Sequence, residues 1–287
     1  MPTMRDIKGR VKSIKNIQQL TRAMMLVAAA KMKKAEIAIT SARPYAHAMG
    51  EVMANLTLRV EREEGYPLLL ERKVKTSGLL MITSQRGLCG GFNSNLIKNV
   101  FHYVEEERDK TIALKLMIIG RKGYNFFKRF DYHIPWTLPT PDPVRYEFAE
   151  DLAERIINLY TSGEVDEIIV VYNEFKSIFR QQIVREKLLP IIPMPMPPSK
   201  IVSEYIYEPS KKEILNTLLK KHIVVQVYRI LLESQASEHA TRMVAMESAT
   251  NNAKKMIDKL WLSFNRARQA IITKEISEIT GTAEALK

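Results

Sequence analysis

A glycine-rich turn at residues 86–95, RGLCGGFNSN, holds the residue types best suited to chemistry. It follows a short apolar run and precedes a helical pattern, and glycines at such a turn can hold a phosphate on backbone amides. The spacing of Gly87, Gly90 and Gly91 matches neither G-x-G-x-x-G nor the P-loop, and no Lys-Ser or Lys-Thr pair follows. We therefore favour a tight turn that presents Arg86 to a partner over a nucleotide site.

Cys89, the only cysteine, lies in the same turn. A nucleophilic cysteine needs a base such as histidine to form its thiolate. The five histidines occur in unrelated contexts, at His47, His102, His133, His222 and His239. We therefore expect Cys89 to be a small packed residue. A single cysteine also excludes an intrachain disulfide and is typical of a reducing compartment.

The remaining polar groups indicate surfaces rather than a catalytic centre. Residues 120–123, GRKG, follow another apolar run and fit a plain strand-to-helix turn, with anion binding as the alternative. The acidic run at residues 105–107 fits an exposed helix face, and nothing has metal-ligand spacing. We expect no catalytic residue, no cofactor and no metal in this chain.

The charge of the chain predicts an acidic partner. The 287 residues carry a formal net charge of +12. Residues 1–43 hold ten Lys or Arg residues against two acidic ones, a local net charge of +8. Three interpretations of this basic segment stay open: a solvated helix face, a nucleic-acid contact, or contact with an acidic protein surface.

The elements that position these residues begin with two helical stretches at opposite ends of the chain. Each repeats apolar or small residues at alternating steps of four and three, which keeps one seam facing a partner helix and produces a left-handed supercoil. We predict an antiparallel coiled coil of a helix over about residues 3–58, which Pro44 can kink, and a helix from about residue 210 to the end. The two seams are Ile7, Val11, Ile14, Gln18, Thr21, Met25, Ala28, Met32, Ala35, Ile39 and Ala42, and Ala236, His239, Met243, Met246, Thr250, Ala253, Ile257, Leu260, Phe264, Ala267 and Ile271.

Between the two helices the apolar period changes, and short apolar runs alternate with helical patterns. This alternation predicts an α/β domain with a mostly parallel sheet. A proline-rich segment at residues 190–198 fits an extended edge and linker. The predicted strands are residues 78–83, 114–120, 132–137, 167–172 and 182–189, and the predicted helices are residues 94–107, 122–129 and 144–160. We expect three parts: residues 1–65, 70–205 and 210–287.

No run of about 18 apolar residues occurs, so we expect no transmembrane helix. The start of the chain, MPTMRDIKGR, is charged at once and lacks the apolar core of a signal peptide, and the helical pattern begins within a few residues of Met1. We therefore expect neither a signal peptide nor a transit peptide.

Three long motifs carry a resemblance to a known family. They are MRDIKGRVKSIKNIQQLTRAMMLVAAAKMKKA at the start, TSQRGLCGGFNSNL with IIGRKGYNFFKR in the middle, and LLESQASEHATRMVAMESATNNAKKMI continuing into NRARQAIITKEISEITGTAEAL. In this order they resemble the γ subunit of F-type ATP synthases, from one end of the chain to the other. The resemblance implies an α/β fold plus a long antiparallel α-helical coiled coil. The terminal helices would form a shaft, and the central domain would be Rossmann-like.

The resemblance also implies a role as a central rotary shaft. Such a shaft couples proton flow through the membrane sector to ATP synthesis or hydrolysis on the β subunits, and regulates ATPase activity. The expected partners are the α and β subunits of an α₃β₃ head, the ε subunit and the membrane c-ring, with one copy of this chain per complex. The chain itself would be no enzyme, bind no nucleic acid, and lie at the cytoplasmic side of the cell membrane as a peripheral subunit.

Three residues are expected contacts to β by resemblance. Arg268 and Gln269 in NRARQA match the family's contact with a β-subunit loop, and Arg86 matches a contact near the acidic lower part of β. The tip, ITGTAEALK, would sit in the apolar sleeve at the top of the head. The chain departs from the family at Gly281-Thr282, where members often have two small residues. It lacks the paired cysteines of the chloroplast form, so thiol regulation is not expected. The expected absence of a transit peptide favours a bacterial subunit.

Two other classes of function are alternatives to the shaft. A basic coiled-coil protein that binds nucleic acid explains the charge but not the small-residue seam, and a salt-dependent shift of DNA mobility would support it. The interpretation as a nucleotide-dependent enzyme is supported only by the glycine turns, and a binding isotherm with ATP would test it.

Overall fold

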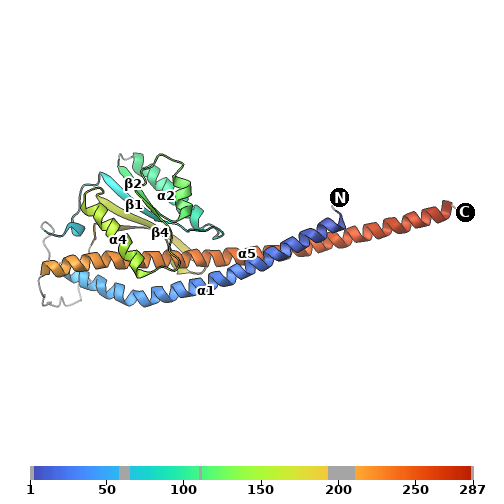
Figure 1. The fold of residues 1–287 in the computed structure, drawn as a ribbon, viewed down its shortest axis with the longest axis horizontal. Helices are drawn as coiled ribbons and strands as arrows, with labels where there is room; N and C mark the ends of the chain where they lie inside the picture. The colour runs from blue at the N-terminus through green and yellow to red at the C-terminus, as the bar shows by residue number, and fades with distance from the viewer. Residues whose placement is uncertain (1–2, 58–64, 110–111, 193–210, 286–287) are drawn as a thin grey trace. The chain divides into compact units, whose positions relative to one another are not determined.

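The computed structural model describes residues 3–57, 65–109, 112–192 and 211–285 (Figure 1). Two long helices dominate it: α1, Met4–Thr57, and α5, Lys211–Ala285. Both agree closely with the predicted bounds. Helix α1 continues through Pro44, so this proline does not end it. The linker predicted at residues 190–198 lies outside the described residues from residue 193 onward.

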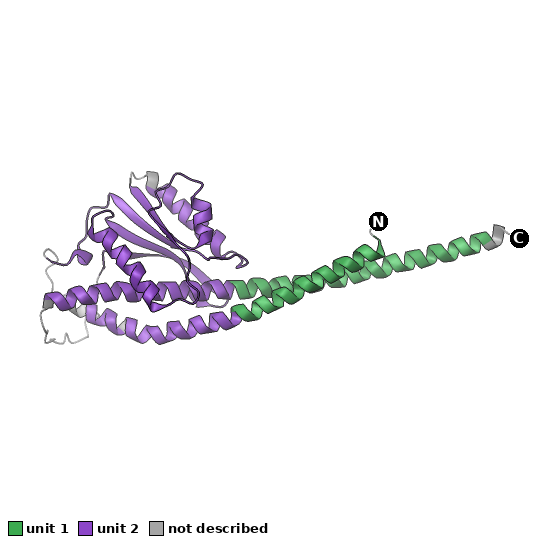
Figure 2. Ribbon diagram, viewed as in Figure 1, with its two compact units in different colours: residues 1–28, 242–287 green, residues 29–241 purple. Residues whose placement is uncertain are grey.

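The chain divides into two compact units (Figure 2). Residues 1–28 and 242–287 form one, which we call the helical-pair unit, and residues 29–241 form the other, the sheet unit. Each long helix contributes to both units. The predicted three-part division along the chain therefore stays a prediction.

The helical-pair unit contains the ends of α1 and α5 side by side, in opposite directions (Figure 2). The apolar seam predicted from the seven-residue register lies on the buried side of the pair, except that its last residue on α5, Ile271, is exposed. Ile7, Val11 and Ala28 are buried on α1, and Met246 and Ala253 are buried on α5. The two hydroxyl oxygens of Thr21 and Thr250 lie 2.8 Å apart, which sets the register that the sequence left open.

The sheet unit contains five strands in the order β3-β2-β1-β4-β5. The first four are parallel and β5 is antiparallel to β4, which confirms the predicted, mostly parallel sheet. The inner strands are near-continuous apolar runs because both faces of the sheet are covered. The strands are β1, Thr76–Ile82; β2, Ala113–Ile119; β3, Thr137–Leu138; β4, Glu167–Ser177; and β5, Arg180–Leu189.

The predicted strand at residues 132–137 is wrong over most of its length. Only His133 bridges to Lys115, and regular pairing begins at Thr137. Pro135 lies between these two points and has no backbone N–H to donate to the ladder of β2, so the strand is interrupted there.

Along the chain, three helices alternate with the strands, and they cover the sheet on its two faces (Figure 1). They are α2, Phe92–Asp109; α3, Arg121–Phe127; and α4, Tyr146–Thr161. Alternate residues of β1 point to opposite faces. Leu79 and Met81 pack with α2 and α3, and Leu80 and Ile82 pack with α4 and the long helices. The carboxyl ends of β1 and β2 therefore meet at one edge, where the turn with Arg86 lies.

Candidate interaction sites

The loop after β1 is held rigidly and projects two side chains. The backbone N–H of Ser84 donates to Asn93 Oδ1 at 2.9 Å, and Asn93 Nδ2 donates to Ser84 Oγ at 2.7 Å. Leu88 adopts a φ of +63°, an uncommon conformation for a bulky residue, and is 63% exposed. Arg86 is exposed in the same loop. The loop thus leaves the side chains of Arg86 and Leu88 exposed.

Cys89 lies beneath this loop and is 2% exposed. Its Sγ is 3.1 Å from the Asn93 amide nitrogen and 3.8 Å from Ser84 Oγ. Neither neighbour is a base that could generate a thiolate. The geometry agrees with the packing role predicted for Cys89.

The second turn, GRKG at residues 120–123, packs tightly against the end of β1. Gly120 has a φ of +96°, and a Cβ built there would lie 2.2 Å from the Thr83 carbonyl oxygen. The Gly123 N–H donates to Thr83 Oγ1 at 3.0 Å, so this amide is already satisfied inside the fold. This geometry favours the plain strand-to-helix turn over an anion site.

Within the described ranges, no group of three or more His, Cys, Asp or Glu side chains is placed to hold a metal ion. Among the same residues, no helix is both long and apolar enough to cross a lipid bilayer.

Arg268 and Gln269 lie on α5 in the helical-pair unit, whereas Arg86 belongs to the sheet unit. Both α5 residues are exposed, and every residue from 268 to 282 is exposed as well. Four large apolar side chains lie in this stretch: Ile271, Ile272, Ile276 and Ile279. At 3.6 residues per turn they share a sector of about 140°, and Arg268 falls inside it. Glu275 and Thr282 fall in the same sector, so it is a mostly apolar face that also holds one cation and one anion.

The sequence reasoning missed a polar cluster around Arg229 in the sheet unit. Arg229 Nη2 donates to both carboxylate oxygens of Glu186, at 2.6 and 2.8 Å, and Nη1 donates to the Tyr172 hydroxyl at 3.1 Å. It also donates to Gln226 on its own helix at 2.9 Å and to Glu233 at 3.3 Å. One guanidinium thus joins α5 to β4 and β5. In the sequence, an arginine within the apolar run YRILL, residues 228–232, is the feature that could have indicated this cluster.

Burial shifts the pKa values in this cluster. It raises the pKa of the Glu233 carboxyl, with Arg229 opposing the shift, and it raises the pKa of Tyr172. Burial acts against the charge of Arg229, but Glu186, Tyr172 and Glu233 together outweigh it and raise the pKa of the guanidinium. Burial lowers the pKa of His222. Glu233 Oε2 has no hydrogen-bond partner in the described chain, which adds to the cost of its charge.

These observations define a class: an α/β protein whose sheet packs against two long helices, with exposed charged residues on a loop after β1 and on one end of α5. A family model described as ATP synthase matches residues 3–286. The chain is 44% identical to the ATP synthase gamma chain of Geotalea daltonii and 46% identical to that of Desulfitobacterium hafniense, and each match covers 100% of both chains.

Solved structures show the same fold. A chain of the Euglena gracilis mitochondrial ATP synthase matches with a TM-score of 0.68 at 18% identity, covering 99% of this chain and 94% of that one. A chain of the Tetrahymena thermophila central stalk and c-ring structure matches with a TM-score of 0.62 at 25% identity, covering 80% and 99%. The chain belongs to the ATP synthase gamma family. It forms the central stalk of an ATP synthase complex, as the resemblance implied.

Proposed function

We propose that this subunit transmits rotation by direct contacts of α5 and the Arg86 loop with the β subunits of an α₃β₃ head. The observation that carries the proposal is the exposed end of α5. An apolar face of four isoleucines is costly in water and fits a surrounding apolar partner. Arg268 lies within that face, where its planar guanidinium suits a carboxylate or backbone carbonyls.

The sheet unit supplies the second contact. Arg86 and Leu88 together offer a cation beside an apolar side chain, and the net charge of +12 of the chain favours an acidic protein surface. We assign this surface to the lower part of β. The ε subunit and the membrane c-ring complete the set of partners, with one copy of the chain per complex at the cytoplasmic face of the cell membrane. The chain contributes no active site of its own, because ATP chemistry belongs to β.

The double substitution Arg268→Ala with Gln269→Ala tests this assignment. If both side chains engage β, losing a buried charge-assisted bond costs about 1.5–3 kcal/mol. ATP hydrolysis by the complex reconstituted with α and β should fall several-fold, or head assembly should weaken. Melting of the isolated subunit should hardly change, because both side chains are exposed in it.

Arg266→Ala is the matched control. Arg266 is exposed on the same helix but lies about 160° around it from Arg268, away from the isoleucines. This variant should assemble and turn over as the unmodified chain does. Equal assembly and equal hydrolysis rates for the control and the double variant would remove Arg268 and Gln269 from the contact site.

A further inference from the structure

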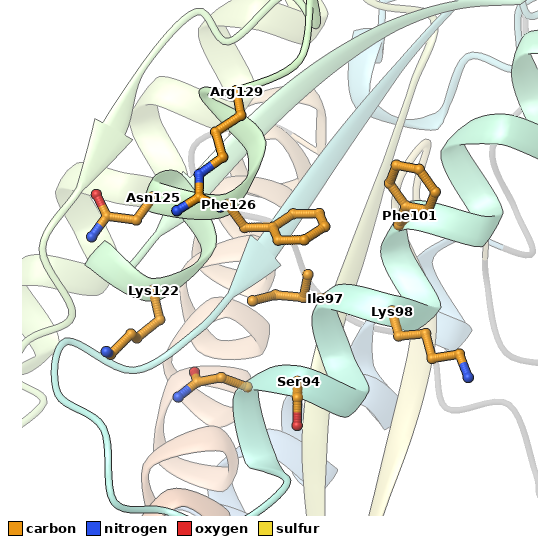
Figure 3. Close-up of a pocket in the computed structure, with 9 residues that line it drawn as sticks. Ser94, Ile97, Lys98, Phe101, Lys122, Asn125, Phe126 and Arg129 are labelled. Carbon is orange, nitrogen blue, oxygen red and sulfur yellow. The ribbon is translucent and has the colours of Figure 1, made fainter.

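A crevice of about 520 Å³ lies between α2 and α3 on the outer face of the sheet unit (Figure 3). Its floor is apolar and is formed by Ile97, Phe101 and Phe126. This volume falls within the range of small-molecule sites, which are mostly apolar with a few polar groups at the edge. The crevice is separate from the loop residues and helix end assigned above.

Three cations surround the apolar floor. Lys98 comes from α2, Lys122 from the start of α3, and Arg129 from just beyond its end (Figure 3). Among the described residues, no acidic one lines the crevice. None of the three side chains takes part in an ion pair in the part of the chain that the structure describes. Three unpaired like charges around one opening create a positive potential that attracts an anion.

The floor is preformed by aromatic packing. The rings of Phe101 and Phe126 meet edge to face with centroids 6.1 Å apart, and Phe130 lies 5.4 and 5.3 Å from them. Such packing holds the rings in place without an occupant, which lowers the entropic cost of binding.

We propose that the crevice between α2 and α3 binds a compact organic anion, in which an apolar group of ring or short-chain size carries a phosphate or a carboxylate. The apolar group lies on Ile97, Phe101 and Phe126, and the anionic group is held by Lys98, Lys122 or Arg129. A nucleoside monophosphate and a medium-chain fatty acid share this chemistry.

The crevice also adjoins the Arg86 loop. Asn93, which lines it, hydrogen-bonds Ser84 and Cys89 in that loop. A Cβ built on Gly87 would lie 3.5 Å from Lys122 Nζ, so this ammonium group lies against the loop backbone. An occupant that draws Lys122 and Asn93 toward itself therefore acts on the loop that presents Arg86.

Fluorescence titration of the full chain with anilinonaphthalene sulfonate tests the proposal, because this probe carries an anionic group on flat apolar rings. We expect a saturable component. Lys98→Ala combined with Lys122→Ala should weaken its affinity roughly tenfold, as expected for the loss of charge-assisted contacts. Ser94→Trp, a substitution at an exposed residue that lines the crevice, should abolish it by filling the space.

Lys128→Ala is the matched control. Its ammonium group lies 5.7 Å from the Tyr124 ring, and Lys128 does not line the crevice. The affinity of the Lys128→Ala variant for the probe should match that of the unmodified chain. Displacement of the probe by adenosine monophosphate would identify a nucleotide ligand, and displacement by octanoate a fatty acid. The proposal is overturned if the lysine and Trp variants bind the probe unchanged, if neither compound displaces it, or if inorganic phosphate alone displaces it equally well.

Discussion

At the scale of single residues, the buried carboxyl of Glu233 makes the free energy of unfolding depend on pH. It is 7% exposed, and one of its carboxylate oxygens has no hydrogen-bond partner in the described chain. Burial raises its pKa above the ordinary value, against the pull of Arg229. The folded state therefore holds the proton more tightly than the unfolded state. This contribution to stability is present at low pH and is lost as the pH rises through the raised pKa.

Glu233→Gln should therefore raise the free energy of unfolding at about pH 8 and leave it unchanged at about pH 4. The amide keeps an acceptor for Arg229 and places donors toward Glu174 and Glu186, whose charges also raise the pKa of Glu233. We expect a gain of roughly 1 kcal/mol in the free energy of unfolding at the higher pH. Denaturant titration at both pH values measures it.

Glu247→Gln, at an exposed position of the same helix, should change stability at neither pH. A loss of stability in Glu233→Gln at the higher pH would show that the charge of Glu233 on Arg229 outweighs its burial.

At the scale of elements, the seam between α1 and α5 is built from small and apolar residues. Ala28 is 2% exposed in this seam, whereas Ala30, two residues further on, is exposed. Small side chains let two helices approach closely, and a seven-residue repeat keeps them on the shared side. Each such layer buries little area. Because the two helices lie close together, the seam has little space for a larger side chain.

Ala28→Trp should overpack the seam and destabilise the subunit by about 1–3 kcal/mol or more. Thermal melting of the isolated chain and the yield of the complex with α and β measure the effect. Ala30→Trp adds the same side chain on the exposed side and should melt as the unmodified chain does. Equal melting of the two variants would mean that Ala28 does not face the other helix.

At the scale of the whole molecule, α5 is one continuous helix that contributes to both units. In the sheet unit its apolar residues pack in the core that also contains Leu80 and Ile82. These apolar contacts are non-directional. The hydrogen bonds of Arg229 to Tyr172 and Glu186 are directional, and they fix the rotation of α5 against β4 and β5.

Arg229→Lys should therefore loosen the coupling between the sheet and α5. Lysine keeps the charge but cannot bond Tyr172, Glu186 and Gln226 together, because it lacks the planar fork. In the complete complex we expect ATP hydrolysis to be kept and ATP-driven proton pumping to fall several-fold. Lys220→Ala, at an exposed position of the same helix, is the control and should pump normally. An unchanged ratio of pumping to hydrolysis in Arg229→Lys would contradict this role.

Much of the fold could be predicted from the sequence, because its signals are local. The seven-residue repeat marks residues that share one side of a helix, and the residues it selected on α1, such as Ile7, Ala28 and Ile39, are buried. Continuous apolar runs marked β1, β2 and β4, since strands covered on both faces need no polar side. The failure at residues 132–137 is also local, because Pro135 interrupts an otherwise apolar stretch.

The tertiary structure alone decided which distant residues meet. Arg229 bonds Glu186, 43 residues away, and Tyr172, 57 residues away, and no period within one element connects them. The same holds for the register set by Thr21 and Thr250, 229 residues apart, and for the crevice that α2 and α3 form together. The sequence by itself determined the elements and the family. Their packing in three dimensions determined the Arg229 cluster and the crevice, because such sites exist only where separate elements come into contact.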